Sequence, residues 1–191
     1  MGGDAASLLD DQEIYETLDP TGFRDRVGGL PQQCLHAWES GLKFSLPDDY
    51  YDVRNVVVAG VGGSAIGGEL LGDLVSVQDS PLVTVCRDYR LPPYLGHDSL
   101  VIASSYSGNT EETLDGVREA LAFGGTVVGI CTGGELEELL ADSEGSVCLK
   151  VPPGQMPRSA FGHIFGTQLA ACWALGLLPA PGEDARSAML E

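Results

Sequence analysis

Short apolar runs alternate with helix-like stretches along most of this chain. From residue 55 onward the runs are rich in Val, Ile, Leu and Cys and lack polar alternation, which is typical of parallel strands covered on both faces. They predict five strands, at 55–59, 82–86, 100–104, 126–131 and 146–151. The periodicity between them predicts helices at 64–76, 109–123, 134–141 and 157–176. This alternation indicates an α/β fold with a doubly wound, five-stranded parallel sheet.

One connection lacks a helical repeat. Residues 87–99 lie between the second and third predicted strands and contain Pro92, Pro93 and Gly96. Parallel strands need a crossover of about a dozen residues or more, and this segment only just supplies them. We therefore expect it to cross the sheet as a loop.

The length suits one α/β domain with a core of its own. We expect an N-terminal helical extension at 1–47, the domain at 48–178, and a linker-like tail at 179–191 that contains Pro and Gly. Breaks at Pro20 and Pro31 divide the extension into two short helices, which we expect to pack on the domain.

Two loops carry the candidate chemistry. The glycine loop, 59–68 (AGVGGSAIGG), and the serine loop, 104–112 (SSYSGNTEE), each follow a predicted strand and lead into a predicted helix. Exposed backbone N–H groups and the positive end of the helix dipole favour anions at such a position. The serine loop adds three hydroxyls, on Ser105, Ser107 and Thr110, which exceeds what a helix cap requires. These features predict a phosphate site at the carboxyl edge of the sheet.

Other interpretations of the glycine loop stay open. Gly60, Gly62 and Ala65 almost satisfy the dinucleotide-binding pattern, although the acidic candidate, Asp88, lies further along than that pattern places it. The loop also lacks the Gly-Lys-Ser/Thr ending of a P-loop, which excludes ordinary triphosphate chemistry. A tight strand-to-helix turn without a ligand fits the glycine loop equally well.

Two side chains near the predicted start of the last long helix also have two interpretations each. Arg158 fits either a surface or capping position, or a bidentate contact with an oxyanion at that edge of the sheet. His163 lies one turn further along, where a single histidine in an apolar helix is more often a packed residue than a base. His36 and His97 have no ligand spacing with carboxylates or cysteines, so we expect no metal.

The charge and the cysteine content limit the partners and the cellular compartment that we expect for this protein. A formal net charge of -18, with two lysines, argues against nucleic acid or an anionic membrane surface as partner. Phosphate binding would then rest on local donors. The five cysteines show no C-x-x-C spacing and lie mostly in apolar stretches, which is typical of reduced, buried residues. With no secretory signal at the start of the sequence, we expect a cytoplasmic protein.

Several motifs, taken together in their order, resemble the bifunctional phosphoglucose/phosphomannose isomerase family of the sugar isomerase (SIS) domain superfamily. They are GGSAIGG at 62–68, RDY at 87–89, LP at 91–92, SYSGNTEET at 105–113 and PR at 157–158. The resemblance implies a three-layer SIS domain at 48–178, in which helices flank a five-stranded parallel sheet of order 2-1-3-4-5.

The resemblance also implies roles for individual residues. Five positions match the family's sugar-phosphate contacts: Gly63, Ser64, Ser105, Ser107 and Thr110. Arg158 matches the family's active-site arginine, which favours a negatively charged intermediate. The implied reaction is the isomerisation of glucose 6-phosphate or mannose 6-phosphate to fructose 6-phosphate through an enediolate, with no cofactor.

The sequence departs from the family in one respect. The family's catalytic glutamate, its histidine and a late lysine come from a second SIS domain, and this sequence ends before such a domain begins. We expect a chain that binds the phosphosugar and needs a second SIS partner, either a separate half or a second copy, for catalysis. Three alternatives stay open. They are a self-sufficient homodimer that uses Glu69, Glu112 or His163, a non-catalytic regulatory module that binds a phosphosugar, and a nicotinamide-dependent oxidoreductase.

Overall fold

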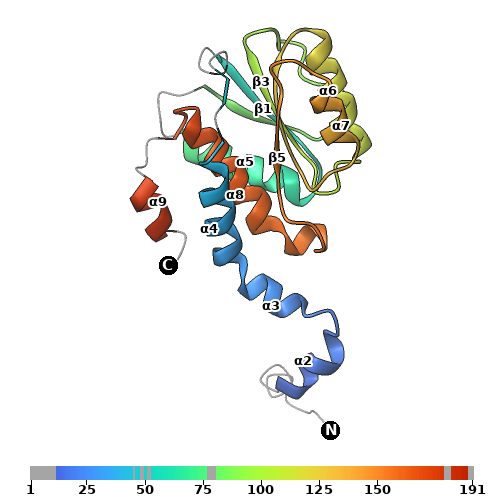
Figure 1. The fold of residues 1–191 in the computed structure, drawn as a ribbon, viewed down its shortest axis with the longest axis vertical. Helices are drawn as coiled ribbons and strands as arrows, with labels where there is room; N and C mark the ends of the chain where they lie inside the picture. The colour runs from blue at the N-terminus through green and yellow to red at the C-terminus, as the bar shows by residue number, and fades with distance from the viewer. Residues whose placement is uncertain are drawn as a thin grey trace.

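Five parallel strands form the sheet at the centre of the fold (Figure 1). The structure is a computed structural model that describes residues 12–44, 46–47, 50, 53–76, 81–178 and 182–188. The strands are β1 (Asn55–Ala59), β2 (Val83–Cys86), β3 (Ser99–Ser104), β4 (Thr126–Cys131) and β5 (Val147–Lys150). Their order is β2-β1-β3-β4-β5 and every neighbouring pair is parallel, which confirms the predicted fold class and strand order.

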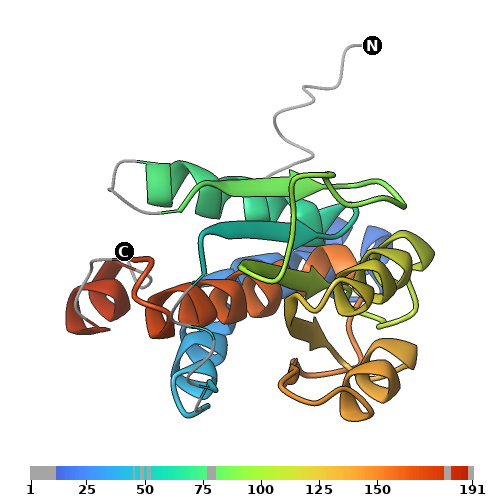
Figure 2. The same cartoon turned by 90° about the horizontal axis from the view of Figure 1, so that it is seen from above.

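Helices cover both faces of the sheet (Figures 1 and 2). Those described are α2 (Gln12–Leu18), α3 (Phe23–Gly28), α4 (Leu30–Gly41), α5 (Gly63–Ser76), α6 (Glu111–Ala122), α7 (Glu135–Ala141), α8 (Phe161–Ala174) and α9 (Gly182–Ala188), with a 3₁₀ turn, η2, at Pro157–Ser159. Helices α5 and α8 share one hydrophobic core with the sheet, and α6 and α7 share the other. Helix α4 packs on α8.

The two cores explain why the strands lack polar alternation. In β1, Val56 and Val58 point into the core beneath α5 and α8, whereas Val57 points into the core beneath α6 and α7. All three side chains are fully buried. A strand covered on both faces has no solvent-facing position for a polar residue. This is the pattern from which the strands were predicted.

The predicted strand and helix positions hold to within two residues, except at the last long helix. That helix, expected over 157–176, is divided into η2 and α8. The hydroxyl and the N–H of Ser159 both donate to the carbonyl oxygen of Met156, which closes a tight turn before α8 begins. The connection after β2 is a loop, as predicted, and it buries Leu91.

The N-terminal segment differs from the sequence expectation. Three helices, α2 to α4, are described where two were predicted, and Pro31 stands in the first turn of α4 rather than breaking a helix. Proline is tolerated there because its missing N–H would have had no partner within the helix. Figure 1 shows α4 alongside α8, whereas α2 extends away from the sheet.

Part of the expected linker-like tail is helical. Residues 182–188 form α9, and Arg186 makes an ion pair with Glu39 of α4 at 3.3 Å. Both side chains are about half exposed, so this pair contributes little to stability. The other residues of the tail lie outside the described part of the chain.

Helices α4 and α8 approach so closely that α8 needs glycine at the contact. A Cβ atom at Gly166 would lie 2.5 Å from the carbonyl oxygen of Cys34 and 2.9 Å from the Cβ of Ala37. At Gly162 it would lie 2.7 Å from the Cβ of Gln33. Backbone atoms cannot move aside like a flexible side chain, so the two glycines set the distance between the helices.

We therefore predict that Gly166→Ala lowers the free energy of unfolding by about 1–3 kcal/mol, because the added methyl group must push α4 away from α8. Urea denaturation measures the change. Gly28→Ala is the matched control, since a Cβ at Gly28 meets no heavy atom within 4 Å. Equal stability of the two variants would contradict the tight contact.

Candidate functional site

The glycine loop and the serine loop border one small cavity. They follow β1 and β3, which are neighbours in the sheet, so both loops leave it at the same carboxyl edge. The cavity has a volume of ≈ 90 Å³ and is lined by Val61, Gly63, Ser64, Tyr106, Ser107, Thr110, Pro157, Phe161 and Ile164. Four of the six residues predicted from the sequence are among these, namely Gly63, Ser64, Ser107 and Thr110. The other two, Ser105 and Arg158, are not.

Ser105 lies directly behind the cavity and supports its wall. Its side chain is buried, and its hydroxyl is 2.7 Å from the hydroxyl of Thr110. The same Ser105 oxygen accepts a hydrogen bond from the N–H of Gly108 at 3.1 Å. Either hydroxyl can be the donor in the Ser105–Thr110 pair; when Ser105 donates to Thr110, the Thr110 proton is free to be donated to a ligand oxygen.

The N-terminus of α6 has no side-chain cap. Thr110 is the N-cap residue, yet its side chain makes no capping hydrogen bond to the helix. Because its hydroxyl pairs with Ser105 instead, it does not occupy the backbone N–H groups of the first turn. These N–H groups and the positive end of the helix dipole favour an anion in the cavity.

The glycine loop brings a second helix N-terminus to the same cavity. Gly62 has a φ of +60°, which favours glycine, and its carbonyl accepts from the N–H groups of Ala65 and Ile66 as α5 begins. A Cβ at Gly63 would meet no atom within 4 Å, so its backbone lies open to a ligand. Ser64 follows it, with its carbonyl held by the side-chain amide of Gln168 at 3.1 Å.

The serine loop is held in place by the connection between β4 and α7. The N–H of Thr132 donates to the carbonyl of Tyr106, and the N–H of Leu136 donates to that of Gly108, both at 2.9 Å. The side chain of Asn109 accepts from the N–H of Glu135 at 3.0 Å. A loop fixed in this way loses little further conformational entropy when a ligand binds.

Tyr106 is a cavity residue that the sequence analysis did not select. Its buried hydroxyl donates to the carbonyl of Pro152 at 2.9 Å and accepts from the N–H of Gln155 at 3.0 Å. Tyr106 thereby ties the serine loop to the segment that leads to Pro157 and Arg158. Its partners lie 46 and 49 residues away, so only its position inside the serine motif could have drawn attention to it.

Arg158 lies on η2, next to the cavity residue Pro157, and its side chain is exposed. The sequence placed it at the start of a long α-helix, whereas η2 is a separate turn before α8. An exposed guanidinium beside an anion site can meet an oxyanion that extends beyond the cavity rim.

His163 is packed between helices and is not one of the described residues that line the cavity. It is 7% exposed, and its ring meets that of His36 edge-on at a centroid distance of 5.9 Å. Burial, together with the neighbouring charge of His36, lowers the pKa of His163 below the ordinary histidine value. A neutral imidazole is therefore the form that this site favours.

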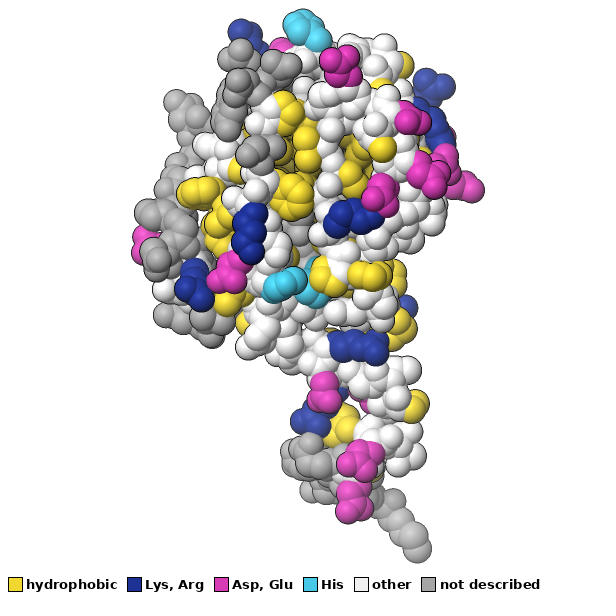
Figure 3. Space-filling view, viewed as in Figure 1, with side chains coloured by type: hydrophobic (Ala, Val, Ile, Leu, Met, Phe, Trp, Pro, Cys, Tyr) yellow, Lys and Arg dark blue, Asp and Glu magenta, His cyan; other side chains and the backbone are white. Residues whose placement is uncertain are grey.

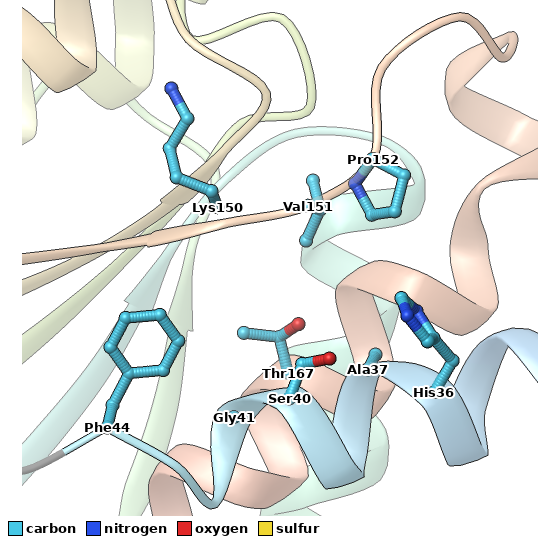
Figure 4. Close-up of a pocket in the computed structure, with 9 residues that line it drawn as sticks. All are labelled: His36, Ala37, Ser40, Gly41, Phe44, Lys150, Val151, Pro152 and Thr167. Atoms are coloured by element: carbon cyan, nitrogen blue, oxygen red, sulfur yellow. The ribbon is translucent and has the colours of Figure 1, made fainter.

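A larger pocket of ≈ 240 Å³ lies elsewhere, between α4, α8 and the end of β5 (Figure 4). Figure 4 shows Lys150 pointing away from Thr167 and Ser40, and its ammonium pairs with Glu137. Phe44 and Ala37 contribute apolar wall to this pocket. The ≈ 90 Å³ cavity is the stronger candidate for an anion, because the N-termini of α5 and α6 border it.

Charged side chains of both signs are mixed on the surface. On the face drawn in Figure 3, Lys and Arg side chains lie among Asp and Glu rather than in one basic cluster. Arg118 contacts both Asp115 and Glu135, for example. In the described part of the chain, no helix is long and apolar enough to cross a membrane.

The fold and the cavity define an α/β domain with a small cavity between two loops at the carboxyl edge of a parallel sheet. A family model for the SIS domain matches residues 49–178. The chain belongs to the SIS domain family.

Several relatives align with this region of the chain. A bifunctional phosphoglucose/phosphomannose isomerase of Caldicellulosiruptor bescii is 44% identical over 154 residues, which are 81% of this chain and 45% of that protein. One of Thermoplasma acidophilum is 42% identical over 110 residues, 58% of this chain and 33% of that protein. A D-glucosamine-6-phosphate 4-epimerase of Sulfolobus acidocaldarius is 39% identical over 133 residues, 67% and 41% of the two chains. The chain therefore spans less than half the length of these relatives.

Solved structures share the fold. The C-terminal domain of glucosamine-fructose-6-phosphate aminotransferase from Francisella tularensis superposes with a TM-score of 0.64 at 13% identity, over 88% of this chain and 52% of that one. Tagatose-6-phosphate ketose/aldose isomerase from Escherichia coli superposes with a TM-score of 0.60 at 15% identity, over 81% of this chain and 47% of that one. At this level of identity the likeness concerns the fold alone.

We predict that Tyr106→Phe leaves the fold intact but loosens residues 152–157, because the carbonyl of Pro152 and the N–H of Gln155 lose their shared partner. Each lost hydrogen bond costs about 1 kcal/mol. Hydrogen exchange at the Gln155 amide should become faster. Tyr94→Phe is the control, since the exposed Tyr94 donates its hydroxyl proton to Thr84, away from residues 152–157. Unchanged exchange at Gln155 would rule out the tie.

A second prediction concerns pH. Because the pKa of His163 is lowered in the folded state, the unfolded chain takes up a proton near the ordinary value of 6.5 while the folded chain resists it. The free energy of unfolding should therefore fall as pH is lowered through that value. Denaturation at several pH values between about 7.5 and 5.5 gives the free energy of unfolding as a function of pH. This free energy should change less with pH in His163→Gln than in the exposed control His97→Gln. An equal pH dependence in the two variants would exclude the effect.

Proposed function

We propose that this chain is the phosphosugar-binding SIS domain of an aldose-ketose isomerase that interconverts glucose 6-phosphate or mannose 6-phosphate with fructose 6-phosphate. The observation that carries the proposal is the cavity in which the Thr110 hydroxyl and two helix N-termini converge. The names of the relatives from Caldicellulosiruptor bescii and Thermoplasma acidophilum support the substrate class.

The donors suit a phosphate group despite the net charge of -18. Hydroxyl and amide donors act over hydrogen-bond distances, whereas the field of distant surface charges is screened beyond roughly 8–10 Å in physiological salt. Hydrogen bonds to a charged group contribute about 1.5–3 kcal/mol each. A few of them offset the repulsion and the entropy of association. In this proposal Gly63, Ser64, Ser107 and Thr110 bind the phosphate, and Ser105 holds Thr110 in position.

The size of the cavity suits part of the substrate. Pockets that enclose a small molecule typically have volumes of about 300–1,000 Å³, and this one has ≈ 90 Å³. The phosphate would therefore occupy the cavity while the sugar extends past Pro157 toward Arg158. At that position the guanidinium would stabilise the negative charge that develops as the enediolate forms.

Proton transfer needs a group from elsewhere. Among the described residues that line the cavity there is no carboxylate or imidazole. A positioned acid or base typically contributes about 10²- to 10⁴-fold to the rate. We therefore assign the base to a second SIS-type half, and the greater length of the relatives supports this assignment.

The self-sufficient homodimer, in which Glu69, Glu112 or His163 of one subunit would complete the other's site, has weaker support. Glu69 is already bound to Arg87 at 2.6 Å, and His163 is buried between helices, so neither is free to reach a second subunit in this arrangement.

Calorimetric titration with fructose 6-phosphate tests the proposed binding. Thr110→Val should weaken binding about tenfold or more, since it removes a charge-assisted hydrogen bond worth about 1.5–3 kcal/mol. Ser76→Ala is the control, because that exposed hydroxyl bonds the carbonyl of Asp73 within α5. Absence of binding by the unmodified chain, or equal affinities in both variants, would refute the phosphate site.

A chimera tests the isomerase activity. In it, this chain replaces the matching part of the Caldicellulosiruptor bescii relative, which supplies the remaining half. We expect the chimera to convert fructose 6-phosphate to its aldose isomers and Arg158→Gln to lower kcat. Turnover by the chain alone at the rate of the chimera would favour the homodimer instead.

A further inference from the structure

The side-chain amide of Gln168 lies inside the core, on helix α8, and the residue is 0% exposed. Its nitrogen donates to the carbonyl of Ser64 at 3.1 Å, between residues 104 positions apart. Its oxygen, Oε1, is buried and has no hydrogen-bond partner in the part of the chain that the structure describes. A buried polar atom without a partner costs stability. Packing of the core alone would therefore favour an apolar residue at this position.

The residue that Gln168 holds belongs to the candidate phosphate site. Ser64 lines the ≈ 90 Å³ cavity and, with Gly63, begins the first turn of α5. The N–H groups of a first turn have no carbonyl partner in their own helix, so they can donate to a ligand. The hydrogen bond from Gln168 fixes the direction of the Ser64 carbonyl and of the peptide that contains it. Ile164, one turn before Gln168 on α8, also lines the cavity.

Gly67 makes room for the Gln168 amide. A Cβ at Gly67 would lie 2.1 Å from Oε1 and 3.1 Å from Cδ of Gln168. Glycine within a helix is less stable than alanine, and Gly67 lies inside α5, so the close approach of Gln168 explains it. Two features that lower stability, an unpartnered oxygen and a helical glycine, thus meet at one hydrogen bond to the cavity wall.

We propose that Gln168 is a positioning residue, whose amide holds the first turn of α5 in the orientation in which Gly63 and Ser64 bind the phosphate group. Gln168 is not one of the described residues that line the cavity, so it acts through Ser64. This inference rests on the proposed function, in which these two residues bind the phosphate of the sugar. It adds a residue of α8, outside both loops, to the determinants of affinity.

Gln168→Met tests the proposal in the chain alone. Methionine is also unbranched and flexible, but it cannot donate a hydrogen bond, and it removes the unpartnered oxygen. Calorimetric titration with fructose 6-phosphate should show an affinity at least threefold lower than that of the unmodified chain. The urea midpoint should be equal or higher. A lower midpoint with unchanged affinity would show that Gln168 only stabilises the fold, and would overturn the inference.

Gln33→Met is the matched control. Gln33 is also buried with an unpartnered Oε1, but its nitrogen donates to the carbonyls of Arg26 and Ser159, both at 3.0 Å. Neither of these residues is among the described residues that line the cavity. We expect this variant to keep its affinity within twofold. An equal loss of affinity in the two glutamine variants would overturn the specific role of Gln168.

Gly67→Ala displaces the amide without changing Gln168 itself. The added methyl group would take the place of Oε1, so affinity for fructose 6-phosphate should fall at least threefold here too. Gly72→Ala is its control on the same helix, because the nearest atom to a Cβ there, the carbonyl oxygen of Val83, is 3.4 Å away. Equal affinities in the two alanine variants would contradict the proposal.

Hydrogen exchange reports on the turn without a ligand. The N–H groups of Ala65 and Ile66 donate to the carbonyl of Gly62 in the first turn of α5. Their exchange should be at least threefold faster in Gln168→Met and unchanged in Gln33→Met. Absence of fructose 6-phosphate binding by the unmodified chain overturns both proposals. Binding by that chain, with unchanged affinity or unchanged exchange in Gln168→Met, overturns this inference alone.

Discussion

One close backbone approach determines the shape of the site. At Gly108 the φ angle is +74°, and a Cβ there would lie 1.7 Å from the carbonyl oxygen of Gly133. Only glycine lets the serine loop pass this close to the connection between β4 and α7. Because the loop is pinned there, the Ser105 hydroxyl meets both the Gly108 N–H and the Thr110 hydroxyl. The donor geometry of the cavity thus follows from a contact between two glycines that do not line it.

The proposed site shows how a strongly acidic chain would bind an anion. Its donors are neutral hydroxyls and backbone amides, which need no positive neighbour and act only at short range. The cationic side chain, Arg158, stands outside the cavity on η2. Tyr106 joins the two regions, since it lines the cavity and hydrogen-bonds the segment that leads to Arg158. Movement of that segment is therefore coupled to the serine loop.

The sequence predicted the parts of the structure that depend on local pattern. Strands such as β1 stand out because both of their faces are buried, and the serine loop stands out because its hydroxyls exceed the need of a helix cap. It did not reveal features that depend on distant partners. The role of Tyr106 depends on residues 46 and 49 positions away. The sequence did favour a packed position for His163, but not its ring partner, His36 of α4. Pro31 was misread because a proline can break a helix or begin one, and sequence position alone does not distinguish them.

Helix α5 connects the ≈ 90 Å³ cavity with the outer surface. Its N-terminus at Gly63 borders the cavity, its inner side packs Leu71 into the core, and its outer side carries Leu70 in solvent. A helix that is apolar on two sides is stable in water only at the cost of exposed hydrocarbon, about 25 cal/mol for each Å² left uncovered. Covering the outer side would recover that energy. The same helix therefore contributes both to the wall of the cavity and to the outer surface of the domain.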